Sequence, residues 1–267
     1  MQVVPECPAA AFVYKEIKMK KRLIAALLSI AMVFCLSACT SQKEFASNVS
    51  DSEAEEEEAE PEEDEDEKTG NAEGAGESVS INGTVDGDVY TNEYFGLRVE
   101  APEGYSFLSA QMLQTLGYMS SQMLKDGDTA YGDAVSEAVD KGQTVIDFEF
   151  ADSAFSNTAN LTLGQVDSRF TQDDIEVMID ASIPYLVQTY ESIGASDLSV
   201  ERSVTTFLGE EMPCINVSFN YAAQGQSIDL DMVQIILIKD GYSATITAQA
   251  GDGETMELLL GAFSRLD

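Results

Sequence analysis

Cys39 has the most informative surroundings in this sequence, because it ends a segment with the layout of a secretory signal peptide. A basic cluster, Lys20–Arg22, precedes an apolar run, Leu23–Phe34, and the small residues Ser37 and Ala38 lead to the cysteine. Basic, apolar and small-residue regions in this order are typical of a leader that is cleaved after the small residues. The chemistry that this spacing predicts is peptide cleavage between Ala38 and Cys39.

The last four residues of this segment, Leu36-Ser37-Ala38-Cys39, resemble the lipobox of bacterial lipoproteins. The resemblance implies that Cys39 carries a covalent diacylglycerol and acyl lipid such as palmitate and becomes the first residue of the mature chain. The apolar run up to Ala38 is about sixteen residues long, at or below the roughly 17–25 residues that span a bilayer. An ordinary transmembrane helix is therefore the weaker alternative, and the predicted location is the extracytoplasmic face of the cell membrane.

The leader also indicates where translation begins. Met19 immediately precedes the basic cluster, so we predict that residues 1–18 are an upstream extension and that the signal peptide spans residues 19–38. N-terminal sequencing of a precursor that begins at Met1 would contradict this start.

A strongly acidic stretch follows the cysteine. Thirteen of the seventeen residues from Asp51 to Glu67 are acidic, and none is aromatic. Like-charge repulsion and a lack of apolar surface keep such a stretch unfolded and extended. We therefore interpret residues 39–80 as the lipidated cysteine and a disordered acidic tether, with cation binding by the tether as an alternative role. Residues 81–267 have the length of one globular domain.

The charge balance restricts the partners of the protein. The full chain has a formal net charge of −34, and loss of residues 1–38 leaves 9 basic and 46 acidic side chains. Nucleic-acid binding needs basic side chains that displace counterions from phosphates, so this class is excluded as a partner. An anionic membrane surface repels the domain as well. The predicted partners are the membrane, through the lipid alone, and a protein or peptide.

The sequence contains no histidine, which excludes Ser-His-Asp and Cys-His catalytic sites. Cys214 is the one cysteine left after lipidation and cleavage, so no His/Cys zinc site is expected either. In a strand-like run a single cysteine is interpreted as a small buried hydrophobic residue. We predict no catalytic residue, no specific metal and no cofactor apart from the lipid on Cys39. A glycan hydrolase that uses two carboxylates stays open as an alternative.

The apolar spacing predicts an α+β domain, in which a twisted antiparallel sheet has helices packed on its faces. Thr171 and Asp174 form a capping-box pattern before a helix that contains Pro184, where a kink or a restart is expected. Strands are expected at residues 198–207, 214–222, 228–239 and 242–249, and a closing helix at residues 256–266.

One further strand shows clear alternation. In Val145–Phe150 the pattern predicts that the apolar side chains face the core, whereas Asp147 and Glu149 face water.

Residues 90–105, Tyr-Thr-Asn-Glu-Tyr-Phe-Gly-Leu-Arg-Val-Glu-Ala-Pro-Glu-Gly-Tyr, resemble the opening of Mog1/PsbP-like domains. The chain is also similar to uncharacterised lipoproteins of gut Firmicutes, which share a leader, an acidic spacer and such a domain. The resemblance implies an α/β/α sandwich, and it implies no site residues. The aromatic residues in this stretch are interpreted as core packing, with a binding rim as the alternative; they are Tyr90, Tyr94, Phe95 and Tyr105.

These observations predict a membrane-anchored extracytoplasmic lipoprotein whose acidic domain is a non-catalytic binding module. The alternatives are the carboxylate-based hydrolase and a carrier of a small ligand.

Overall fold

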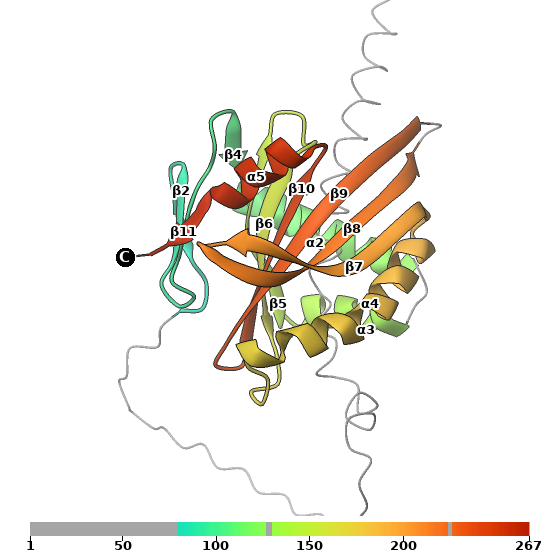
Figure 1. Ribbon diagram of the computed structural model, residues 1–267, viewed down its shortest axis with the longest axis horizontal. Coiled ribbons are helices and arrows are strands. Elements are labelled where there is room, and N and C mark those ends of the chain that lie inside the picture. Colours follow the sequence, from blue (N-terminus) through green and yellow to red (C-terminus); the bar gives the residue numbers. More distant parts are fainter. Residues whose placement is uncertain (1–79, 127–129, 224–225, 267) are drawn as a thin grey trace, which may run out of the picture.

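The computed structural model describes residues 80–126, 130–223 and 226–266, which form an α+β fold with two antiparallel sheets (Figure 1). This confirms the fold class expected from the sequence. The larger sheet has the strand order β4-β5-β6-β10-β9-β8-β7. Its strands are β4 (Tyr105–Phe107), β5 (Thr144–Asp152), β6 (Thr158–Gln165), β7 (Ala195–Phe207), β8 (Glu210–Ala223), β9 (Gln226–Lys239) and β10 (Tyr242–Ala250).

Tight two-residue turns connect the long strands of this sheet. Leu208 and Gly209 join β7 to β8, and Asp240 and Gly241 join β9 to β10; all four residues have positive φ angles between 48° and 81°. Two consecutive positive φ angles define the turn whose twist matches the twist of the strands it connects. These turns set the register in which β7 pairs with β8 and β9 pairs with β10.

The smaller sheet has the order β1-β2-β3-β11, and the sequence did not reveal it. Its strands are β1 (Thr84–Asp86), β2 (Val89–Asn92), β3 (Leu97–Glu100) and β11 (Phe263–Arg265). The expected closing helix is wrong in its second half, because α5 ends at Gly261 and Phe263 pairs with Val99 of β3. Burial explains the change, since the Phe263 ring packs 5.4 Å from the Phe207 ring.

The helices α2 (Ala110–Asp126), α3 (Ala130–Asp140) and α4 (Ile175–Ser192) pack on one face of the large sheet. A single 3-10 turn, η4 (Gln172–Asp174), precedes α4, and the Asp174 carboxylate accepts hydrogen bonds from the Thr171 backbone N–H and hydroxyl, both at 2.9 Å. The helix continues through Pro184 and does not restart there.

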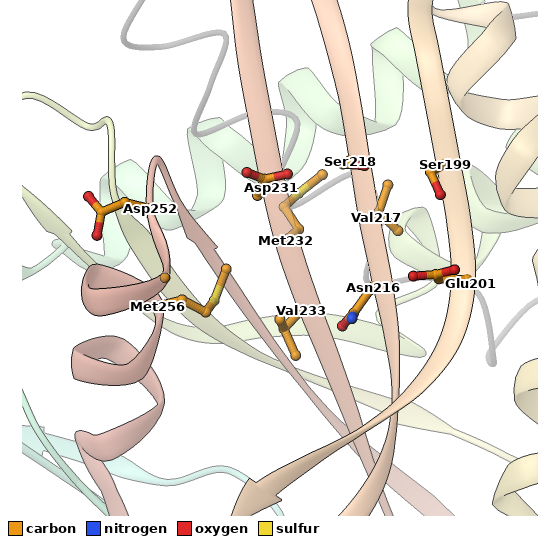
Figure 2. A pocket seen from close by; sticks show the side chains of 11 residues that line it. Ser199, Glu201, Asn216, Val217, Ser218, Asp231, Met232, Val233, Asp252 and Met256 are labelled. Carbon is orange, nitrogen blue, oxygen red and sulfur yellow. The ribbon is translucent and has the colours of Figure 1, made fainter.

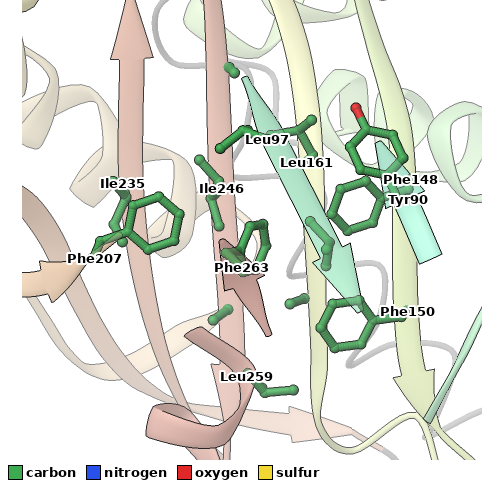
Figure 3. Close-up of a cluster of buried hydrophobic side chains, with 14 of the residues drawn as sticks. Tyr90, Leu97, Phe148, Phe150, Leu161, Phe207, Ile235, Ile246, Leu259 and Phe263 are labelled. Carbon is green, nitrogen blue, oxygen red and sulfur yellow. The ribbon is translucent and has the colours of Figure 1, made fainter. Parts of the chain in front are cut away.

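The small sheet and α5 (Gly253–Gly261) cover the opposite face of the large sheet. The core between them is rich in aromatic rings, and Figure 3 shows Tyr90, Phe148 and Phe150 among its members. The large sheet is therefore the middle layer of the domain, and each of its faces has its own apolar core.

Candidate functional site

The residues expected to be lipidated and cleaved, Cys39 and Ala38, lie outside the described residues, as does the acidic tether. Their roles stay predictions. Across residues 80–126, 130–223 and 226–266, the helices are too short or too polar to cross a membrane.

The aromatic residues considered as a binding rim occupy three separate positions. Tyr90 is completely buried on β2, and its ring centroid lies 4.3 Å from that of Phe148. Tyr94 and Phe95 contact each other in the turn between β2 and β3, with ring centroids 5.0 Å apart. Tyr105 lies on β4 at the edge of the large sheet. Tyr90 belongs to the apolar core between the two sheets, Phe95 and Tyr105 pack against that core, and Tyr94 contacts Phe95.

Cys214 is completely buried on β8. Burial raises the pKa of its thiol to about 11, so the nucleophilic thiolate is scarce at neutral pH. The thiol donates a weak hydrogen bond of 3.6 Å to Oδ1 of Asn216. Cys214 thus packs as a small core residue and contacts the Asn216 side chain.

Asn216 lies in an open groove of about 310 Å³ between α5 and the strands β7, β8 and β9 (Figure 2). We call this the α5 groove. Figure 2 shows Asp252 and Met256 on the helix side, and Asn216 and Glu201 on the strand side. The lining residues are Ser199, Glu201, Asn216, Val217, Ser218, Asp231, Met232, Val233, Asp252, Gly253 and Met256.

The α5 groove has a negative rim. Glu201, Asp231 and Asp252 are exposed carboxylates, and the lining contains no lysine or arginine. Asp252 also caps α5, because its carboxylate accepts hydrogen bonds from the Thr255 backbone N–H at 2.8 Å and the Thr255 hydroxyl at 3.0 Å. These hydrogen bonds lower the pKa of Asp252 and keep it charged. The geometry suits a positively charged group that enters from solvent.

A second polar feature lies inside the domain, on the helix-covered face of the large sheet. Glu149, Asn160, Thr247 and Gln234 stand directly opposite one another on β5, β6, β10 and β9. We call these four residues the polar row. Each is at most 1 % exposed. Side chains directly opposite on neighbouring antiparallel strands have Cβ atoms about 5 Å apart, so the row is continuous.

Most hydrogen-bonding capacity of the polar row is unused by the described residues. Gln234 donates to the Thr247 hydroxyl at 3.2 Å. Both carboxyl oxygens of Glu149 and both amide atoms of Asn160 have no hydrogen-bond partner in the described part of the chain, and the same holds for the hydroxyl of Thr162, next along β6. Buried polar groups are normally paired, so this concentration of unpaired atoms marks an unusual interior.

Glu149 is also electrostatically unusual. Burial raises the pKa of its carboxyl to about 8, and no charged group contributes to the shift. The carboxyl is therefore mostly protonated at pH 7 and can both donate and accept a hydrogen bond. Burial alone thus sets the protonation state of Glu149 in the folded chain.

The expectation that Glu149 faces water is wrong. The register between β5 and β6 shifts between Ile146 and Phe148, so Asp147 and Phe148 both lie toward the small sheet, while Glu149 points to the opposite, helix-covered face. The overlooked signal is on the partner strand, where Asn160 and Thr162 alternate with apolar residues although both faces of β6 are buried.

Comparison with known proteins gives distant similarities of fold. No family model matches the chain, and no curated protein does. Similar solved structures include PsbP (CyanoP) from Synechocystis sp. PCC 6803, at 8% identity over 72% of this chain and 97% of that chain, with a TM-score of 0.38. LpqN, involved in cell envelope biogenesis of Mycobacterium tuberculosis, is 13% identical over 63% of this chain and 82% of that chain, with a TM-score of 0.29.

A third similar structure comes from Bacteroides thetaiotaomicron VPI-5482, at 7% identity over 68% of this chain and 49% of that chain, with a TM-score of 0.34. At such identities the likeness concerns the fold alone, and at TM-scores below 0.5 it supports no assignment to a family or a function.

Proposed function

We propose that the protein is a lipid-anchored extracytoplasmic lipoprotein whose acidic domain binds, without catalysis, a positively charged protein or peptide. The observation that carries this proposal is the α5 groove, an open depression with three exposed carboxylates on its rim and no basic residue in its lining. The net charge of −34 attracts cationic partners from a distance, and the groove provides a place for close contact.

The composition of the groove fits a peptide or a protruding loop. Met256 and Val233 offer partly buried apolar surface between the rim carboxylates, and Asn216 and Ser218 offer hydrogen-bonding groups to a peptide backbone. Interfaces combine apolar contact with a polar rim in this way. A lysine or arginine side chain would extend its apolar stem over Met256 and place its charge at the rim.

The groove can be tested with a basic probe peptide of alternating lysine and alanine. We expect the double variant Glu201→Gln with Asp231→Asn to weaken binding of this peptide about tenfold at physiological salt, because two charge-assisted contacts are lost. Fluorescence titration against the labelled peptide measures the dissociation constants. The matched control is Asp88→Asn with Glu103→Gln, which changes the net charge equally at exposed positions outside the groove.

Equal weakening in both double variants would show that general charge, and not the α5 groove, attracts the peptide. A binding module also has a stoichiometric partner in its own membrane. A pull-down from detergent-solubilised membranes that recovers none would contradict the proposal.

The lipid anchor can be tested at one residue. We predict that Cys39→Ser releases the domain from the membrane or leaves the leader uncut, because a single sulfur is the proposed attachment point. Each buried CH₂ of an acyl chain contributes about 0.8 kcal/mol, so two or three chains outweigh the charge repulsion. Membrane fractionation and mass spectrometry measure the outcome, with Cys214→Ser as the control that keeps its attachment. Processed Cys39→Ser protein that stays in washed membranes would contradict the anchor.

A further inference from the structure

The interior around Glu149 contains several unpaired polar side-chain atoms and no positively charged group among the described residues. Glu149, Asn160 and Thr162 together present a carboxyl group, an amide and a hydroxyl, and none of their side-chain polar atoms has a hydrogen-bond partner in the described residues. All three residues are at most 1 % exposed. Glu149 and Asn160 are opposite each other, and Thr162 is two residues farther along β6 on the same face. These side chains therefore form one compact group of oxygen donors.

No charged group among the described residues contributes to the electrostatics of Glu149. Lys125 and Asp126 end α2, and on α3 the described acidic residues are exposed. On the strands that flank β5 and β6, the residues facing the same side are uncharged. Burial alone accounts for the raised pKa of the Glu149 carboxyl. The interior is thus neutral while Glu149 holds its proton, and it becomes singly negative when Glu149 loses it.

A glutamate at this position lowers the free energy of unfolding at neutral pH compared with a glutamine. A protonated carboxyl and a carboxamide both provide one acceptor and at least one donor, and the carboxamide carries no penalty for ionisation. The extra property of the carboxyl is that it can supply one negative charge. A buried negative charge is stabilised when a positive charge enters the interior and pairs with it.

We propose that Glu149, Asn160 and Thr162 form a buried site for a single positive charge, delivered by a monovalent cation that is either an alkali ion or a primary ammonium group. Both cations are satisfied by oxygen donors alone, namely a carboxylate, an amide oxygen and a hydroxyl. One carboxylate neutralises one positive charge, which favours a monovalent ion over calcium, whose sites collect several carboxylates. This site is separate from the α5 groove, which lies against the opposite face of the sheet.

Binding at this site exchanges one cation for one proton. The Glu149 O–H bond breaks, the proton leaves to solvent, and the carboxylate pairs with the incoming cation, so the interior stays neutral. Because the proton competes for the same carboxylate, we expect the affinity to fall about tenfold for each pH unit below about pH 8 and to be constant above it. A cation bound to the acidic surface would show no such dependence in this pH range, because exposed carboxylates are already ionised.

The experiment measures thermal unfolding of the full-length chain in detergent at pH 9. Sodium, potassium or methylammonium chloride replaces the chloride of the bulky quaternary cation tetraethylammonium, at constant ionic strength. We expect a saturable rise in the unfolding midpoint of about 5 °C at one hundred times the dissociation constant. A response to sodium or potassium alone identifies an alkali-ion site, and a response to methylammonium alone identifies a site for an amine ligand.

The variant Glu149→Gln is expected to abolish the response, while the control Glu211→Gln, at an exposed residue on β8, keeps it. A second measurement does not depend on stability. At pH 7 the wild-type chain should release close to one proton per bound cation, and Glu149→Gln should release none. The proposal is overturned if none of the three cations gives a saturable shift, or if Glu149→Gln responds as the wild type does.

Discussion

Replacing Glu149 with glutamine is expected to raise the free energy of unfolding at pH 7 by about 3 kcal/mol when no site-sized cation is present. Folding at this pH protonates Glu149, whose carboxyl is ionised in the unfolded chain. The pKa rises from its usual 4.5 to about 8 in the folded protein because the side chain is buried. Glutamine fills the same volume and has no proton to take up. Few single substitutions at a buried polar position stabilise a protein, so the sign alone is informative.

The increase in the free energy of unfolding that Glu149→Gln produces becomes larger as the pH rises. Below pH 4.5 the carboxyl is protonated in both the folded and the unfolded chain, and the penalty is absent. Between pH 4.5 and pH 8 only the unfolded chain is ionised, so the wild type loses about 1.4 kcal/mol of stability per pH unit relative to the variant. Above pH 8 the difference stays constant. Urea denaturation of both proteins from pH 4 to pH 9 measures this curve.

The control for this prediction is Glu211→Gln, which removes an exposed carboxylate from a strand. It should change the free energy of unfolding by less than about 0.5 kcal/mol, without a trend across the same pH range. A destabilised Glu149→Gln protein, or a difference that does not change between pH 5 and pH 8, would show that Glu149 is not held protonated in the folded chain.

The sequence predicts the large sheet better than it predicts its interior. Alternation and turn residues identify the four long strands, because Gly209 and Gly241 mark turns that only a few residue types adopt. The capping pair Thr171 and Asp174 is local, and its three-residue spacing alone predicts it. Such signals depend on residues close together in the chain, so they can be recognised in one sequence without any comparison.

The parts that the sequence did not reveal depend on distant residues. Phe263 fits a helical spacing with Leu259, yet it pairs with Val99 from the other end of the domain. Strict alternation along β5 predicts that Glu149 faces water, but the register shift near Asp147 turns it to the interior, and a bulge of this kind has no reliable local signature. The three rim carboxylates of the α5 groove come from β7, β9 and the N-cap of α5, so tertiary structure alone brings them together.

Asp147 itself gives the second large effect, because it links the small sheet to the large one. Its carboxylate accepts hydrogen bonds from the Tyr90 hydroxyl at 2.5 Å, the Gly83 backbone N–H at 2.8 Å and the Asn82 amide at 3.1 Å. Asp147→Ala is expected to lower the free energy of unfolding by about 3 kcal/mol, since hydrogen bonds to a charged acceptor are lost and the buried Tyr90 hydroxyl loses its acceptor. Urea denaturation measures the loss.

Tyr90→Phe separates this network from simple packing, because phenylalanine keeps the ring that lies 4.3 Å from Phe148. Alone it should cost about 1–2 kcal/mol, and in the Asp147→Ala background it should cost much less, since the hydrogen bond between the two side chains is already gone. Hydrogen exchange should also rise in β1 and β2 in the Asp147→Ala protein, because Asp147 holds the segment that begins at Asn82. Additive costs and unchanged exchange would mean that the aromatic core alone, and not the Asp147 carboxylate, joins the two sheets.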